Sequence, residues 1–252
     1  MEDLYFPPSL RHFEPLRVLP QAALDHMCFE YDLVEALRPR LVVDLGAGDA
    51  SSFFVFCQAL RDHDVDGVCF AVDEWSDDEH KTEEDETHTL AINHHARSYY
   101  RGIAYLCKLS PAQALAHFAD ATVDLLRIDA QRLSLPLDQL IAAWLPRVAP
   151  AGALICPGVG APDSELGRAW EGATRGRDTF TFRGGGGLGV LRPDPAAREA
   201  RPQLLALLGS SDPHDRRDLE RYYAHAAEHH ALRRALRPIR FNIGRKKTKD
   251  SG

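Results

Sequence analysis

Apolar runs that end in turn residues alternate with segments of helical periodicity through most of this chain. Residues 21–38 place their apolar side chains on one helical face, and Pro39 stops that helix. Five runs short enough for strands follow: Leu41–Leu45, the apolar part of Val65–Asp73, Ile103–Cys107, Val123–Asp129 and Gly152–Cys156. Alternating strands and helices predict an α/β fold, a Rossmann-like doubly wound parallel sheet.

The segments between these runs carry helix signals, and the last two runs carry a hairpin signal. Ser110 is expected to cap a helix because Pro111 follows at the first helical position. Two short runs separated by glycines predict a final antiparallel β-hairpin. The expected elements are helices over Phe53–Leu60, Thr87–Tyr100 and Leu133–Leu145, a helix or loop over 165–176, and the hairpin Thr179–Phe182 with Gly187–Leu191.

The two ends of the chain differ in composition from this repeating part. Residues 1–20 are rich in proline and arginine and predict an irregular N-terminal arm. Residues 21–192 are expected to form the α/β domain. Residues 193–237 predict a linker and a C-terminal helix that starts at Asp212-Pro213 and ends near Leu236. Residues 238–252 are basic and are expected to be a disordered tail.

The stretch from Asp44 to Gly48 is the centre of the predicted site. A buried strand there runs into two glycines one residue apart, which let the backbone turn sharply and approach a ligand closely. Ser51 or Ser52 is expected to cap the following helix. A dinucleotide site would need a third glycine three positions after Gly48, where Ser51 stands. The acid Asp44 also suits a cationic ligand better than a phosphate.

The second strand also ends in an acid, Asp73, where a ribose diol is bound in nucleotide-binding α/β folds. Glu74 and Trp75 follow it, and an acidic run continues to Glu86. Trp75 offers a ring on which an adenine or a sugar could stack. His80 lies in this run, on the side of the sheet where ligands bind.

Composition narrows the classes of function. The formal net charge of -7 argues against a general nucleic-acid binder. No run of about 18 apolar residues predicts a membrane span, and the N-terminus lacks signal-peptide character. The five cysteines lie in apolar segments without metal-ligand spacing, which favours reduced thiols in a cytoplasmic protein.

Asp44-Leu45-Gly46-Ala47-Gly48 resembles motif I, D/E-x-G-x-G, of the class I S-adenosylmethionine-dependent methyltransferases. The resemblance covers residues 22–192 and is closest to methyltransferase domains associated with bacterial polysaccharide and glycosyl-transfer proteins. The matching blocks are Leu41–Gly48, Ala71–Trp75 with Asp78–His80, Val123–Asp129 and Gly187–Leu191.

The resemblance implies roles for the residues at the strand ends. Motif I would hold the amino-acid end of S-adenosylmethionine, and Asp73 would hold its ribose. Trp75 and Ser110 would lie on the adenine side. Asp129 and His80 are the candidate catalytic residues near the acceptor. The complete expected cofactor set is Asp44, Gly46, Ala47, Gly48, Asp73, Glu74, Trp75 and Ser110.

The sequence departs from this family at two places. Family members continue the fourth strand as I-D-G-x-H, but here Ala130-Gln131-Arg132 follow Asp129. The fifth strand of the family ends in H-D, and here Pro157-Gly158 stand there. Asp129 alone cannot supply the oxygen ligands that a divalent cation needs, so no metal is expected.

We therefore expect an S-adenosylmethionine-dependent O-methyltransferase that acts on a sugar or another small hydroxylated metabolite. One alternative is a catalytically lapsed fold that binds cofactor or serves as a scaffold for a glycosyltransferase. A nicotinamide-dependent oxidoreductase is disfavoured by Ser51 and Asp44. The C-terminal helix is a possible contact for a second copy of the chain or for a glycosyltransferase.

Overall fold

A seven-stranded sheet forms the centre of the computed structural model, which describes residues 7–17, 26–75, 83–197 and 203–243. The strand order is β3-β2-β1-β4-β5-β7-β6. The first five strands are parallel, while β7 runs antiparallel to β5 and β6. The strands are β1 (Leu41–Leu45), β2 (Val68–Asp73), β3 (Ala104–Lys108), β4 (Val123–Ile128), β5 (Val148–Pro157), β6 (Asp178–Phe182) and β7 (Leu188–Arg192).

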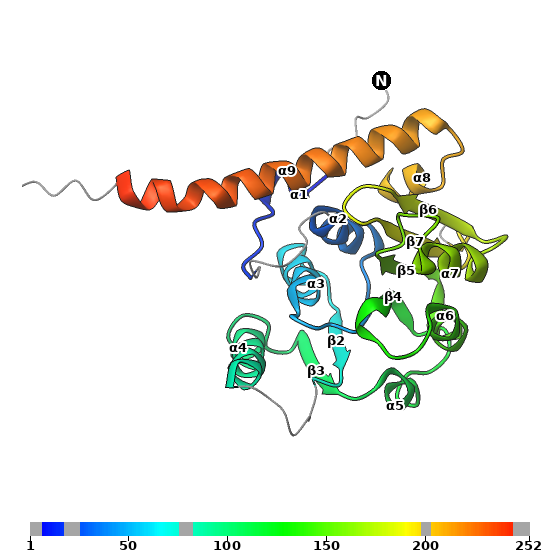
Figure 1. Cartoon of the computed structure of the whole chain (residues 1–252), viewed down its shortest axis with the longest axis horizontal. Helices are drawn as coiled ribbons and strands as arrows, with labels where there is room; N and C mark the ends of the chain where they lie inside the picture. Colours follow the sequence, from blue (N-terminus) through cyan, green and yellow to red (C-terminus); the bar gives the residue numbers. More distant parts are fainter. Residues whose placement is uncertain (1–6, 18–25, 76–82, 198–202, 244–252) are drawn as a thin grey trace, which may run out of the picture.

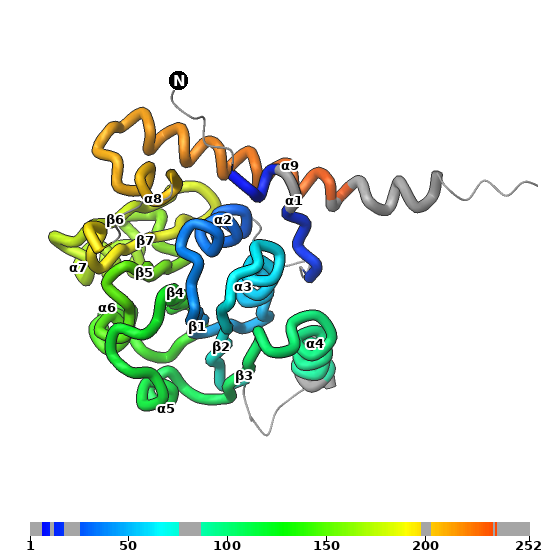
Figure 2. Tube along the Cα trace, turned by 180° about the vertical axis from the view of Figure 1, so that it is seen from behind, coloured from blue at the N-terminus to red at the C-terminus, as the bar shows by residue number. Residues whose placement is uncertain are grey.

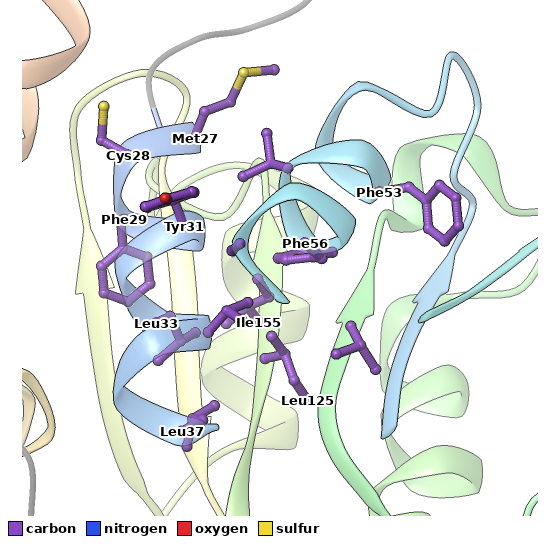
Figure 3. Packing of buried hydrophobic residues seen from close by; sticks show 14 of the residues in the cluster. Met27, Cys28, Phe29, Tyr31, Leu33, Leu37, Phe53, Phe56, Leu125 and Ile155 are labelled. Carbon is purple, nitrogen blue, oxygen red and sulfur yellow. The ribbon is translucent and has the colours of Figure 1, made fainter. Parts of the chain in front are cut away.

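Helices cover both faces of the sheet and bury two apolar clusters against it (Figure 1). Helices α2, α3, α8 and α9 contribute to the first cluster, and α5, α6 and α7 contribute to the second. Figure 3 shows α2 and α3 packing side chains such as Phe29 and Phe56 toward Leu125 and Ile155 of the sheet. The α-helices are α1 (Ser9–His12), α2 (Met27–Leu37), α3 (Ser51–Asp62), α4 (Glu83–Tyr99), α5 (Pro111–Leu115), α6 (Leu137–Trp144), α7 (Glu165–Ala173), α8 (Gln203–Leu208) and α9 (Pro213–Ile243).

The predicted doubly wound sheet with a final antiparallel hairpin is confirmed. Parallel pairing brings the carboxyl ends of β1, β2 and β4 to one edge, because each of these strands runs in the same direction. Asp44 of β1 stands directly opposite Arg127 of β4 in the register. The acids that end the strands are therefore neighbours in space, as the sequence suggested.

Some local predictions are wrong. Residues 9–12 of the arm expected to be irregular form α1, and the helix expected from Leu133 begins at Leu137. Neither Ser51 nor Ser52 caps α3, because the cap position is Ala50, which makes no side-chain cap bond. Ser51 instead donates its backbone N–H to Asp49 Oδ1 at 2.8 Å. The C-terminal helix also continues to Ile243, so residues 238–243 of the expected tail are helical. Residues 244–252 lie outside the described residues.

Helix α9 lies across the outer side of α2, and both views show it running past α1 (Figures 1 and 2). A buried carboxylate joins these helices: Asp32 of α2 accepts hydrogen bonds from Ser9 Oγ at 2.6 Å and Tyr223 Oη at 3.0 Å. Burial raises the pKa of Asp32 to about 7. Within the described residues no helix has the length and apolar character to cross a membrane.

Candidate functional site

The turn after β1 is built from residues in left-handed backbone conformations. Gly46 and Gly48 have φ angles of +76° and +53°, and Ala50 follows at 60°. A side chain at Gly46 would place its Cβ 2.9 Å from the carbonyl oxygen of Asp129. The glycines are therefore needed both for the backbone conformation and for the close approach of β4.

Asp73, Trp75 and Gly48 form one hydrogen-bonded unit. Gly48 donates its N–H to Asp73 Oδ2 at 2.8 Å, and Trp75 donates its N–H to Asp73 Oδ1 at 2.9 Å. The indole Nε1–H of Trp75 donates back to the carbonyl of Gly48 at 3.0 Å. Trp75 has a φ of 32°, a costly conformation that these bonds hold in place. The partly exposed Asp73 carboxylate is thus fixed beside the glycine turn.

A buried ion cluster lies beneath the turn. The guanidinium of Arg127 contacts Asp44 Oδ1 at 3.0 Å, Glu30 Oε1 at 3.3 Å and Asp129 Oδ2 at 3.4 Å. Arg127, Asp44 and Glu30 are at most 8% exposed, so one cation faces several acids where water hardly reaches. Asp44 Oδ2 is buried without a hydrogen-bond partner among the described residues.

Burial, more than the neighbouring charges, shifts the pKa values of the acids in the cluster. Burial raises the pKa of Glu30 to about 7, against the lowering effect of Arg127. The pKa of Asp44 is also raised, first by burial and further by Asp129 and Asp73. Burial alone would lower the pKa of Arg127, but the surrounding carboxylates raise it. The cluster therefore favours a positively charged group nearby.

A cavity of about 540 Å³ opens above the cluster at the carboxyl edge of the sheet. Its walls come from the glycine turn, the starts of α2 and α3, the segment after β4 and the β6–β7 loop. Asp129 and Arg132 both line it, and Arg132 Nε lies 3.6 Å from Asp129 Oδ2. A Cβ on Gly48 would meet the Arg132 guanidinium at 2.4 Å, so this side chain lies directly against the turn.

The structure brings together only part of the predicted site. Ala47 and Asp129 line the cavity, whereas Asp44 is fully buried and contacts Arg127. Glu74 is exposed beside Asp73. Ser110 follows β3, the strand next to β2, and its hydroxyl caps α5 by accepting from Gln113 N–H at 3.3 Å. His80 lies outside the described residues.

Sequence reasoning missed Glu30 and Arg127, although each carries a signal. Glu30 lies three positions after Met27 and four before Val34, on the face predicted to be apolar. Arg127 interrupts an otherwise apolar strand. Charged residues in such positions are rarely buried unless paired, so each pointed to a partner.

One histidine of α4, His95, is held among aromatic rings. His95 packs against the rings of Phe54 and Tyr100, with centroids 4.6 Å and 5.6 Å away. Burial lowers the pKa of His95 to about 4, so the ring is neutral at pH 7. Among the residues with described positions, no cluster of three histidine, cysteine or acidic side chains is arranged to hold a metal ion.

Comparisons with known proteins agree with this geometry. Residues 43–157 match the family model described as a methyltransferase domain. The chain is 31% identical over 194 residues to the uncharacterized protein y4gI of Sinorhizobium fredii. That match covers 76% of this chain and 21% of the relative, so the chain spans about a fifth of the relative's length.

Solved structures of low sequence identity share the fold. A methyltransferase from Geobacter sulfurreducens has a TM-score of 0.50 at 18% identity, covering 68% of this chain and 80% of that one. A candidate caffeoyl-CoA O-methyltransferase from Staphylococcus aureus has a TM-score of 0.52 at 13% identity, covering 69% and 84%. Residues 43–157 therefore match a methyltransferase domain, and the chain shares the Rossmann-like fold of these solved structures.

Proposed function

We propose that the chain transfers a methyl group from S-adenosylmethionine to a hydroxyl of a sugar or another small hydroxylated metabolite. The observation that carries this proposal is the Asp73 carboxylate, held by Gly48 and Trp75 at the mouth of the glycine turn. Each carboxylate oxygen has more than one acceptor site, so Asp73 can still accept from a ribose diol.

The charge of the site fits this cofactor. The buried acids Asp44 and Glu30 exceed the single cation Arg127, and an oxygen of Asp44 has no partner among the described residues. S-adenosylmethionine carries a sulfonium and an ammonium, which such a cluster attracts. In this proposal Gly46, Ala47 and Gly48 hold the amino-acid end of the cofactor, and Asp44 acts mainly by orienting Arg127.

The remaining assignments follow the edge of the sheet. Trp75, Glu74 and Ser110 lie at or just beyond the ends of β2 and β3, on the side assigned to adenine. The bound cofactor would supply the methyl group and a leaving thioether. The protein mainly aligns the acceptor hydroxyl and removes its proton. Asp129 and His80 remain the proposed groups near the acceptor, and Asp129 lines the cavity.

Calorimetric titration tests this proposal directly. S-adenosylhomocysteine should bind the wild-type protein, while NAD should not. Gly46→Val should abolish the binding, because its side chain would collide with the Asp129 carbonyl. Tight NAD binding without any response to S-adenosylhomocysteine would overturn the assignment in favour of a nicotinamide-dependent enzyme.

One observation favours the lapsed-enzyme alternative. Arg132 stands where the resembling family has histidine, and it is already engaged with Asp129. A protein of this kind would bind S-adenosylhomocysteine yet methylate no acceptor in a screen of sugars and phenols. Turnover of any acceptor rejects this alternative.

The wider setting is also part of the proposal. We place the protein in the cytoplasm, in polysaccharide biosynthesis, with a glycosyltransferase or a second copy of the chain contacting α9. The five free thiols support the cytoplasmic location, and the exposed Leu232 of α9, 63% accessible, supports the contact; the polysaccharide setting rests on the sequence resemblance alone. Size-exclusion chromatography with Leu232→Glu checks the contact, because a charged side chain should weaken an apolar interface.

A further inference from the structure

A second cavity of about 300 Å³ lies between α9, the loop that joins β6 to β7, and the start of α2. Its aromatic wall consists of His26, Phe182 and Tyr223. The His26 and Phe182 rings lie 5.9 Å apart, and the Phe182 and Tyr223 rings meet edge to face at 5.9 Å. The volume is at the lower end of the range for small-molecule sites, which begins at about 300 Å³.

This cavity adjoins the cavity of about 540 Å³ that Ala47 and Asp129 line. His26 and Gly185 line both of them, so the two spaces meet at the start of α2 and the β6–β7 loop. The loop lies at the carboxyl edge of the sheet because Leu188, the first residue of β7, pairs with Pro157 at the end of β5. A ligand in the second cavity therefore lies beside the strand ends that carry the cofactor residues.

The shared wall is held in a fixed position. Gly158 donates its N–H to the carbonyl of Gly187 at 2.8 Å, and Gly160 donates to Gly186 at 3.0 Å. Arg183 donates its backbone N–H to Glu220 Oε1 of α9 at 3.1 Å. These bonds tie the loop to β5 on one side and to α9 on the other, so the cavity is a built feature of the fold.

One face of helix α9 forms the opposite wall of the cavity. Ala224, Ala227 and Ala231 recur at helical spacing, and their short side chains leave the space open. Glu220 and Glu228 lie on the same face and line the cavity with carboxylates. Among the described residues that line it, none is a lysine or an arginine.

We infer that this second cavity binds the methyl acceptor and that the acceptor is a neutral sugar ring, an inference that rests on the proposed methyl transfer. Phe182 and Tyr223 are 3% and 1% exposed, so the partly exposed ring of His26 is the face on which the C–H side of a pyranose can pack, because aromatic faces are negative and C–H groups are slightly positive. Carboxylates accept hydrogen bonds from several hydroxyls at once. The acids also repel phosphorylated or carboxylated acceptors.

The test uses an exposed alanine of the cavity wall and an exposed alanine of the same helix outside it. Ala224→Trp fills the cavity, whereas Ala235→Trp adds the same side chain at a position that does not line it. Both are surface positions on α9, so the fold is retained, which thermal melting by circular dichroism verifies. Calorimetry with S-adenosylhomocysteine should give dissociation constants within twofold for the wild type and both variants.

Acceptor binding is followed by saturation-transfer NMR in the presence of S-adenosylhomocysteine. The probes are neutral methyl pyranosides, glucose 6-phosphate and catechol. We expect a signal from at least one neutral pyranoside, no signal from the phosphate ester, and a loss of at least tenfold in Ala224→Trp only. Glu228→Gln should weaken the binding of the same pyranoside severalfold.

The outcomes separate the two proposals. If the wild type does not bind S-adenosylhomocysteine, the proposed function is overturned, whether or not the pyranosides give a saturation-transfer signal. Normal cofactor binding with no pyranoside signal, or with a signal unchanged in Ala224→Trp, overturns the acceptor cavity. Catechol binding that Ala224→Trp abolishes, without any pyranoside signal, overturns the sugar assignment.

Discussion

Replacing Arg127 by methionine should destabilise the folded protein strongly. Arg127 is the cation shared by Glu30, Asp44 and Asp129, and its side chain is 9% exposed. Methionine fills similar space but leaves buried carboxylates without a counter-charge. Removing one partner of a buried ion pair typically costs about 3–5 kcal/mol, and several acids share this partner. We expect the upper part of that range at pH 8.

The unfolding free energy lost in Arg127→Met should be smaller at low pH than at high pH. The pKa of Glu30 is about 7 in the folded protein and 4.5 in its ordinary state, so its contribution to stability is present below about 4.5 and is lost as pH rises through 7. At about 1.4 kcal/mol for each pKa unit, that contribution is about 3 kcal/mol. Without Arg127 the pKa of Glu30 rises further, so protonation relieves the variant more at pH 5.5 than at pH 8.

Urea unfolding followed by circular dichroism at pH 5.5, 7 and 8 measures the effect. Arg61→Met is a matched control, because Arg61 forms an exposed pair with Asp62 and such pairs contribute about 0–1 kcal/mol. Adding Asp44→Asn and Glu30→Gln to Arg127→Met should recover at least half of the loss at pH 8. A loss below about 1 kcal/mol, or one that is equal at pH 5.5 and 8, would refute this account of the cluster.

Three further predictions concern the cofactor site. Asp73→Ala should weaken the binding of S-adenosylhomocysteine by roughly tenfold or more, since a hydrogen bond to a charged group contributes about 1.5–3 kcal/mol. The control is Asp66→Ala, which removes an exposed acid before β2 and should leave the dissociation constant measured by calorimetry unchanged. Gly46→Ala should lose both stability and cofactor binding, whereas Gly102→Ala, also at positive φ but with nothing within 4 Å, should cost only about 1–2 kcal/mol of unfolding free energy. Any methyl transfer should persist in chelator, because Asp129 is the only acid at the ends of β4 and β5 and the neighbouring Asp44 is engaged with Arg127; activity that is lost in chelator and restored by magnesium would contradict this.

Most of the fold follows from local pattern. Each strand of the parallel set is a short apolar run that ends in polar or turn residues, and such runs need both faces covered by helices. Asp44, Asp73 and Asp129 each stand at or next to a strand end, so parallel pairing alone places them at one edge. That reasoning requires no knowledge of long-range contacts, which is why it succeeds.

The ion cluster could not be derived in the same way. Glu30 and Arg127 are 97 positions apart, and Tyr223 lies 191 positions from its partner Asp32. Helical periodicity assigns charged residues to the solvent side, yet α2 is covered by the sheet on one side and by α9 on the other. A helix with two covered sides buries residues that a one-sided pattern exposes.

The departures from the family motif acquire physical roles in this fold. Arg132 pairs with Asp129 and lies against Gly48, where a ligand running along the turn would meet it. Gly158 binds the β6–β7 loop through its N–H, and that loop forms the boundary between the two cavities. Polar groups removed from the ends of β4 and β5 thus leave acceptor recognition to α9 and the start of α2. Arg132→His alone should therefore change turnover more than sugar binding, because Arg132 lines the cavity that contains Asp129 and is not among the residues that line the second cavity.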